Sequence, residues 1–118
     1  MTTAFLVVSL VAVALNGFSG VAALVHFKPI LPGMAAAGVP ESWLTFPIGT
    51  LKMAGALGLL AGVVVWPPVG AAAAAGLVLF FVCALYTHVR VHDYSAQFGL
   101  ANGFLAVNAA ALGLALAV

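Results

Sequence analysis

Long apolar stretches alternate along the chain with short segments that contain proline, glycine and most of the charged residues. The apolar stretches lie at about residues 4–27, 43–66, 69–88 and 96–118. Each has roughly the 20 residues that cross a bilayer as an α-helix. Their apolar character is continuous rather than alternating, which excludes a membrane β-barrel. The pattern therefore predicts an all-α membrane protein, with residues 1–118 forming a single domain that is an antiparallel bundle of four transmembrane helices.

The connections between these stretches differ in length and composition. The segment "WPPVG" at residues 66–70 predicts a tight turn, because two prolines can end one helix and open the next. The first connection, "KPILPGMAAAGVPES", is longer, and its proline and glycine content predicts irregular chain. In an antiparallel bundle this connection and the third one share a side of the membrane. They contain Lys28 and Arg90, so the positive-inside rule places them in the cytoplasm and both termini outside the cell membrane.

Composition supports a protein embedded in the lipid bilayer. Of the 118 residues 66% are hydrophobic and 4% are charged, whereas about a quarter of the residues in soluble domains are charged. So few polar groups cannot cover a surface that faces water. The formal net charge is +1 and no basic patch is present, which excludes nucleic acid as a partner.

Small residues recur at four-residue spacing within the second and fourth stretches. Gly58–Gly62 ("GLLAG") and Gly99–Gly103 ("GLANG") are pairs of the kind that lets helix backbones approach closely in lipid. We expect both pairs to pack within the bundle. The alternative is that they form the face of a homodimer.

Lys52 is a charged residue well inside an apolar stretch. About nine residues of helix place it ~13 Å deep, where inserting a lysine costs roughly 2.5–3.5 kcal/mol. Lys52 therefore needs a partner or a cavity, unless its side chain reaches back to the nearer interface. Glu41 is eleven residues away, or three helical turns, and is expected on the same helix face. A lysine held in this way can serve as a general base.

The antiparallel order would bring other polar residues toward the same end of the bundle. We therefore expect a polar pocket inside the bundle, open toward the charged end, with Lys52 near its floor. The candidate catalytic residues are Lys52, Glu41, His88 and Asp93. The candidate ligand-binding residues are Asn16, His26, Arg90 and Asn102. His88, Arg90 and Asp93 are expected to form one bonded set, in which the carboxylate accepts from the arginine or a histidine.

The segment "HVRVH" raises the question of a metal site. His88 and His92 are spaced i and i+4, which would suit one metal ion if the helix continued. No carboxylate or cysteine stands at a characteristic spacing beside them, so no metal site is predicted. Cationic side chains that stabilise the negative end of a helix are the simpler interpretation.

Several of these motifs occur together in a known family. "GVPESW", "FPIGTLKMAGALGLLAG", the proline turn, the Ala/Gly-rich span and "YTHVRVHD" make the chain resemble the DoxX-like small membrane proteins. The resemblance covers nearly the whole chain and implies a four-helix bundle. Some relatives have glutamate at the position of Lys52, so that glutamate's role is not transferred. The resemblance also implies an association with redox systems, oxidative-stress complexes or assembly of membrane proteins.

Three functions follow as hypotheses. The first is an accessory subunit of a redox or stress system that binds a quinone-like or isoprenoid-like molecule, or another lipid, in the pocket at Lys52. The second is a self-sufficient membrane enzyme that performs acid–base chemistry on an apolar substrate, such as an isomerisation, a hydration or an epoxide opening. The third is an assembly factor that recognises partner helices. No cofactor motif is identified, so electrons in any redox reaction would belong to the bound molecule or to a redox-protein partner.

Overall fold

The computed structural model describes residues 2–117, and most of them are helical. Four segments of this range are long and apolar enough to cross a membrane. They are α1 (Thr3–Leu24), the segment Glu41–Val64 that ends in α3 (Thr50–Val64), α4 (Pro67–Arg90) and α5 (Ala96–Ala117). The predicted all-α membrane fold is confirmed.

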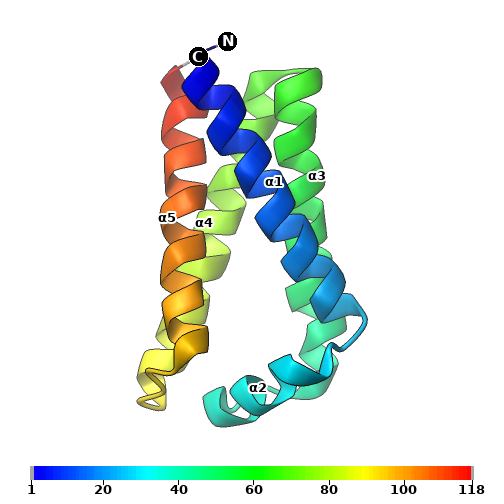
Figure 1. Cartoon of the computed structure of the whole chain (residues 1–118), viewed down its shortest axis with the longest axis vertical. Helices are drawn as coiled ribbons and strands as arrows, with labels where there is room; N and C mark the ends of the chain where they lie inside the picture. The colour runs from blue at the N-terminus through cyan, green and yellow to red at the C-terminus, as the bar shows by residue number, and fades with distance from the viewer. Residues whose placement is uncertain (1, 118) are drawn as a thin grey trace.

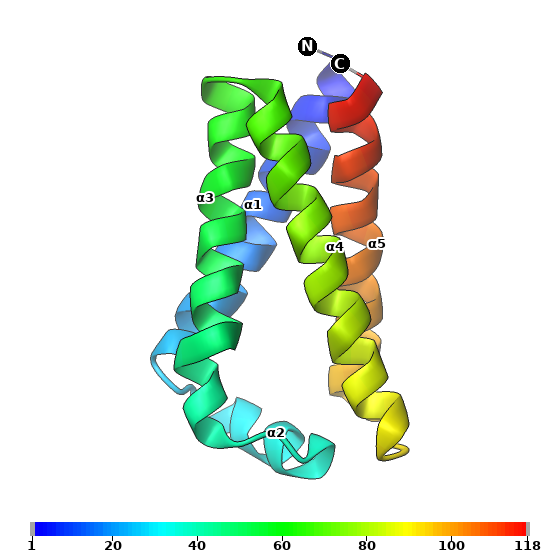
Figure 2. The same cartoon turned by 180° about the vertical axis from the view of Figure 1, so that it is seen from behind.

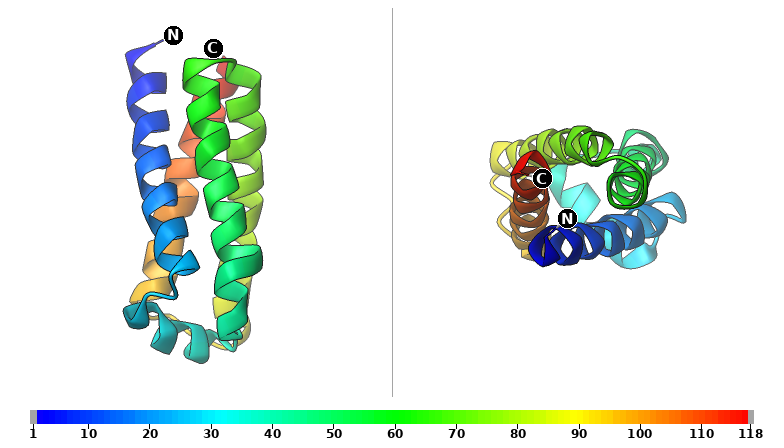
Figure 3. Two further views of the ribbon diagram at one scale, coloured as in Figure 1. Left: turned by 90° about the vertical axis from the view of Figure 1, so that its right-hand side faces the viewer. Right: turned by 90° about the horizontal axis from the view of Figure 1, so that it is seen from above.

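The four long helices stand side by side in a ring. α1 packs against α3 and α5, and α4 packs against the same two helices from the other side (Figure 3). Both ends of the chain and the α3–α4 turn lie at the top of Figure 1, whereas α2 (Leu31–Ala37) and the α4–α5 turn lie at the bottom. We call the side of the α3–α4 turn the closed end and the side of α2 the open end. Seen from behind, α3 and α4 diverge from the closed end to the open end (Figure 2).

Small side chains hold the helices together toward the closed end. A Cβ atom on Gly62 would overlap the Cα of Gly70, and a Cβ on Gly58 would lie 2.6 Å from the Cβ of Ala73. The Gly58–Gly62 pair thus packs α3 against α4 within the chain. In contrast, a Cβ on Gly99 or Gly103 would meet open space, and a homodimer through this second pair stays a prediction.

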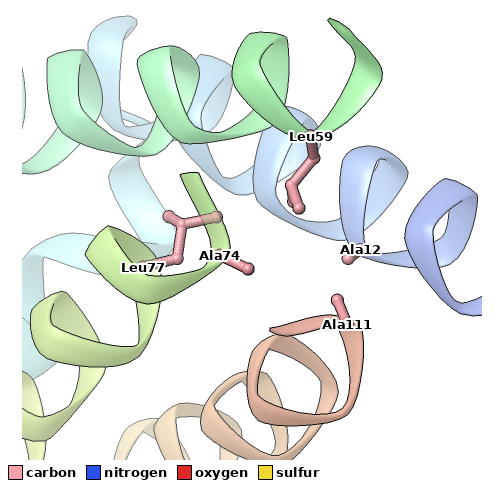
Figure 4. Packing of buried hydrophobic residues seen from close by; sticks show 5 residues of the cluster. All are labelled: Ala12, Leu59, Ala74, Leu77 and Ala111. Carbon is pink, nitrogen blue, oxygen red and sulfur yellow. The ribbon is translucent and has the colours of Figure 1, made fainter. Parts of the chain in front are cut away.

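The core between the four long helices consists largely of small apolar residues. It contains one or two residues from each helix: Ala12, Leu59, Ala74, Leu77 and Ala111 (Figure 4). Large apolar side chains face outward instead, such as Phe18, which is 76% exposed, and Leu79, which is 66% exposed. This arrangement suits lipid, where small residues at helix interfaces permit close van der Waals packing.

A pair of asparagines joins α1 to α5 inside this core. Asn16 Nδ2 donates to Asn108 Oδ1 at 2.8 Å, and Asn108 Nδ2 donates back to Asn16 Oδ1 at 3.3 Å. Asn16 also donates to the carbonyl of Ala12 at 2.8 Å. Both asparagine side chains are fully buried, so their polar groups are satisfied by each other rather than by water or a ligand.

The first connection is more regular than the sequence indicated. The prediction of irregular chain is wrong for Leu31–Ala37, which forms the short helix α2. Pro32 lies in its first turn, where the missing N–H costs nothing, and the following alanines favour helix. Gly38 ends the helix with φ of 73°, a left-handed conformation that glycine adopts without a Cβ clash.

The second membrane segment is less regular than predicted. The regular α-helix begins at Thr50, after a 3₁₀ turn (η2, Glu41–Leu44) and a π-type turn (η3, Thr45–Gly49). Phe46 is extended, with φ of −145° and ψ of 134°, because the residue before a proline avoids the helical region. The expectation that Glu41 and Lys52 share one continuous helix face is therefore wrong.

Candidate functional site

A cavity of about 540 Å³ lies at the open end of the bundle. All four long helices contribute to its walls, and so do α2 and the segment that joins α2 to η3. Figure 2 shows α2 at the open end of the bundle. Most lining residues are apolar. The polar ones are Ser19, Lys52, Thr87, His88 and Gln97. A hollow of this size with a few polar groups on apolar walls matches the usual character of small-molecule sites, which span about 300–1,000 Å³.

Lys52 lies on the wall of this cavity, in the first turn of α3. Its Nζ donates a hydrogen bond to Ser19 Oγ of α1 at 2.8 Å. The same Nζ lies 5.5 Å from the ring centroids of both Phe80 and Phe81 of α4, which is cation–π distance. An ammonium group has three donors, and within residues 2–117 no carboxylate forms a salt bridge with this one. Lys52 can therefore bind a hydrogen-bond acceptor or an anion in the cavity.

His88 lines the same cavity and is oriented by Asp93. His88 Nδ1 lies 2.9 Å from Asp93 Oδ2, and both side chains are largely buried. Since a carboxylate only accepts, Nδ1 carries a proton toward Asp93, and Nε2 takes no part in this contact. The backbone N–H of Ser95 donates to the other carboxylate oxygen at 3.3 Å. The hydrogen bond from His88, with those from Ser95, holds the pKa of the Asp93 carboxyl below its usual value.

Arg90 stands apart from this pair. Its side chain is exposed, and within the described part of the chain no hydrogen bond joins it to Asp93. Its guanidinium instead lies beside Gly38 at the end of α2, with one nitrogen 3.9 Å from where a Cβ would stand. The structure thus brings together two members of the predicted set of three, His88 and Asp93.

His26 and Glu41 form a second pair at the open end, outside the cavity. His26 Nδ1 lies 3.0 Å from Glu41 Oε2, and Nε2 lies 2.9 Å from the hydroxyl of Thr45. His26 comes just after α1 and has φ of 52°, a left-handed conformation that lets the chain turn toward α2. This pair ties the end of α1 to the segment before α3. Glu41 is occupied there and does not approach Lys52.

The two asparagines proposed as ligand-binding residues also lie away from the cavity. Asn16 bonds to Asn108 in the α1–α5 interface. Asn102 is exposed on α5 and donates to the carbonyl of Phe98 on its own helix at 3.0 Å. Of the eight candidate residues, the cavity lining includes Lys52 and His88, and Asp93 supports His88 from behind.

The two histidines of "HVRVH" do not share a helix face. α4 ends at Arg90, and His92 has φ of 56°, so the helix does not continue through the i, i+4 pair. Among residues 2–117 no group of three His, Cys, Asp or Glu side chains is placed to hold a metal ion.

The comparison with protein families gives a match over nearly the whole chain. The sequence model of the DoxX-like family matches residues 7–118, which include all the long helices except the first turn of α1. The chain belongs to the DoxX-like family. No curated protein and no solved structure matches this DoxX-like chain.

Sequence reasoning missed the aromatic neighbours of Lys52. Phe80 and Phe81 are adjacent in an apolar helix, and no periodicity distinguishes them from residues that face lipid. Ser19 offered a clearer signal, because its position in the first span lies at about the depth of Lys52. Thr45, which bonds to His26, lay in a stretch expected to be regular helix.

Proposed function

We propose that this DoxX-like protein binds a lipophilic molecule in the cavity at the open end, with the polar group of that molecule held by Lys52. The observation that carries the proposal is the position of Lys52: an ammonium on an otherwise apolar cavity wall, with one hydrogen bond to Ser19 and two aromatic rings beside it. A buried cation without a carboxylate partner is costly, so a retained one favours a functional role. A quinone-like or isoprenoid-like carbonyl compound fits this chemistry. An accessory role in a redox or stress system agrees with the associations that the family resemblance implied.

The experiment compares ligand content between matched lysine variants. Wild type, Lys52→Met and Lys28→Met are purified in mild detergent and studied by native mass spectrometry and solvent extraction. Lys28 is exposed in the turn η1 (Lys28–Ile30), so its replacement makes the same chemical change away from the cavity. We expect a co-purifying lipophile with wild type and Lys28→Met and its loss from Lys52→Met. Equal ligand content in all three proteins would contradict the proposal.

Thermal stability measured on the same preparations separates binding from folding. Lys52→Met keeps most of the apolar length of lysine and removes the charge, so it should be as stable as wild type or more stable without ligand. Lys52→Arg should also lose the ligand, because the larger planar guanidinium does not replace a compact ammonium. A Lys52→Met variant that is destabilised but keeps its ligand would make the lysine a structural residue.

A second candidate function is acid–base catalysis on the bound molecule. The observation that favours it is the His88–Asp93 pair, because a carboxylate that orients an imidazole at a cavity wall is a common arrangement for proton transfer. In this function His88 and Lys52 would exchange protons with the substrate. Conversion of the extracted lipophile by wild type but not by His88→Gln would support catalysis over binding alone.

The orientation proposed for the chain follows from its few charges. Lys28 and Arg90 both lie at the open end, at the start of the α2 segment and at the end of α4. The positive-inside rule then favours an open end in the cytoplasm. Reporter fusions at the C-terminus, active only on one side of the cell membrane, test this orientation.

A further inference from the structure

The gap between α3 and α4 widens from the closed end toward the cavity. Gly62 and Gly70 bring the two backbones into contact near the turn (Figure 2). Further along α4, a Cβ on Gly76 would meet no atom within 4 Å, although Gly76 lines the cavity. At this position of α4, then, no side chain fills the space beside the cavity.

A second hollow, of about 240 Å³, lies along this gap between α3 and α4. It shares Leu51, Gly76 and Phe80 with the larger cavity, so the two hollows adjoin at these residues. Its remaining lining is apolar and consists of Ala54, Gly55, Ala73 and Leu77. The larger hollow thus reaches Lys52, and the smaller one beside it lies between α3 and α4.

Two residues that line the larger cavity on α3 and α4 also face outward. Leu51 is 44% exposed and Leu79 is 66% exposed, and both line the cavity. Since α3 and α4 are membrane-spanning helices, the surroundings of these residues are hydrocarbon rather than water. Access to the cavity from the open end is covered by α2. There a Cβ on Gly33 would lie 2.6 Å from Gln97 Cγ of α5.

We propose that the α3–α4 gap at Gly76 is a lateral opening of the cavity to the bilayer. The ligand that fits it is a single-chain amphiphile, with a hydrogen-bond-accepting head group at Lys52 and a hydrocarbon chain that leaves between α3 and α4. The ammonium of Lys52 would bind the head group, and the apolar lining of the smaller hollow between α3 and α4 would contact the hydrocarbon chain. This inference rests on the proposed function and specifies the ligand class and its route.

The test narrows the opening without disturbing the fold. Gly76→Phe adds a ring where no atom lies within 4 Å of the new Cβ, and Gly113→Phe makes the same change at an exposed position of α5, far from the cavity lining. Both variants replace a glycine inside a helix, so their effects on helix propensity match. The proteins are placed in phosphatidylcholine nanodiscs, and the probe is palmitic acid with a diazirine at the chain end.

Photolabelling after increasing times of incubation gives a rate and a final extent of loading. We expect saturable labelling of wild type that unlabelled palmitic acid competes away, with adducts on α3 and α4 near Ala54 and Ala73. Gly76→Phe should load at least about tenfold more slowly, and Gly113→Phe within about twofold of wild type, because a narrowed passage lowers the association rate. Lys52→Met should lose the saturable labelling.

Several outcomes would overturn the lateral opening. One is equal loading rates for Gly76→Phe and Gly113→Phe while wild type loads. Another is a Gly76→Phe variant that loads at the wild-type rate but reaches a lower final extent of labelling. That result would place Gly76 in the binding site rather than on the route. Adducts on α2 would indicate access from the open end. If wild type shows no competition by palmitic acid but keeps its co-purified lipophile in a Lys52-dependent way, the ligand class is wrong and the proposed function stands.

Discussion

The closed and open ends of the bundle are built from different side chains. Toward the closed end, glycine and alanine let α3 and α4 touch, as at Gly62 and Gly70, and the core residues of Figure 4 are mostly alanines. Toward the open end, the helices diverge around a cavity lined by larger residues and by Lys52. The same four helices thus provide close packing in one half and an open chamber in the other.

The polar contacts differ between the two ends as well. In the packed core, Asn16 and Asn108 bond directly to each other and are shielded from any ligand. At the open end, ionisable residues are paired locally, as in His26–Glu41 and His88–Asp93, within or next to connecting segments. The difference indicates that small residues and the asparagine pair hold the helices together, whereas the open end carries the ionisable residues, of which Lys52 and His88 line the cavity.

The largest expected effect comes from breaking the helix contact at the closed end. Gly62→Leu would force α3 away from α4, because even a Cβ there overlaps the backbone of Gly70. Overpacking against a side chain typically costs about 1–3 kcal/mol, and a clash with backbone should exceed about 3 kcal/mol. We expect loss of the monodisperse protein in fluorescence-detected size-exclusion chromatography. Gly113→Leu, at an exposed position, is the control and should behave as wild type.

A smaller effect is expected from the asparagine pair. Asn16→Leu leaves the buried amide of Asn108 without its partner and should destabilise the protein by about 1–3 kcal/mol. The double variant Asn16→Leu/Asn108→Leu removes both polar groups and should recover part of this loss. A double-mutant cycle of unfolding free energies measures the coupling, expected to be about 0.5–2 kcal/mol. Strictly additive losses would show that the pair does not act as a unit.

The His88–Asp93 pair predicts a pH dependence that belongs to the open end. The pKa of Asp93 is lower in the folded protein than its ordinary value of 3.8, so the pair stabilises the fold above that pH. This stabilisation should be lost as the pH falls through the lowered pKa. We expect Asp93→Asn to melt below wild type at neutral pH and to show a smaller further drop below pH 3.8.

The control for this pH dependence is Glu41→Gln, which removes a different carboxylate at the same end of the bundle. An acid-induced drop in Asp93→Asn as large as that of wild type would show that other groups cause it.

The smallest effect is expected from the exposed pair between His26 and Glu41. The side chain of Glu41 is 60% exposed, and ion pairs in such surroundings contribute about 1 kcal/mol or less. Glu41→Gln should therefore change the melting temperature little and leave ligand content unchanged. If Glu41→Gln lost as much ligand as Lys52→Met, Glu41 would belong to the ligand-binding site. The contrast between Glu41, which pairs with His26, and Lys52 in the cavity would then be wrong.

The sequence predicted the membrane segments well, because their length and continuous apolar character depend on the bilayer rather than on tertiary contacts. Gly58–Gly62 was expected at a helix interface and lies in one. The irregular start of the second segment was missed, although Pro47 gave a local reason for it. Hydropathy does not distinguish a helix from an apolar turn, so the extended conformation of Phe46 was not predicted.

The site was predicted less completely than the fold. The depth of Lys52 predicted that its ammonium needs a partner or a cavity, because a charge in hydrocarbon is costly. The partners of the polar residues could not be predicted, since they depend on how α1, α4 and α5 rotate about their axes. In the structure Asn16 faces Asn108, and Phe80 and Phe81 face Lys52.

The two tryptophans of the chain stand at opposite ends of this asymmetric bundle. Trp43 lines the cavity, and Trp66 lies in the turn between α3 and α4 at the closed end. If the proposed ligand binds, it should change the emission of Trp43 and leave that of Trp66 unchanged, because Trp66 lies at the other end of the bundle. Variants that keep one tryptophan each would therefore separate a signal from the cavity from a reference signal at the closed end.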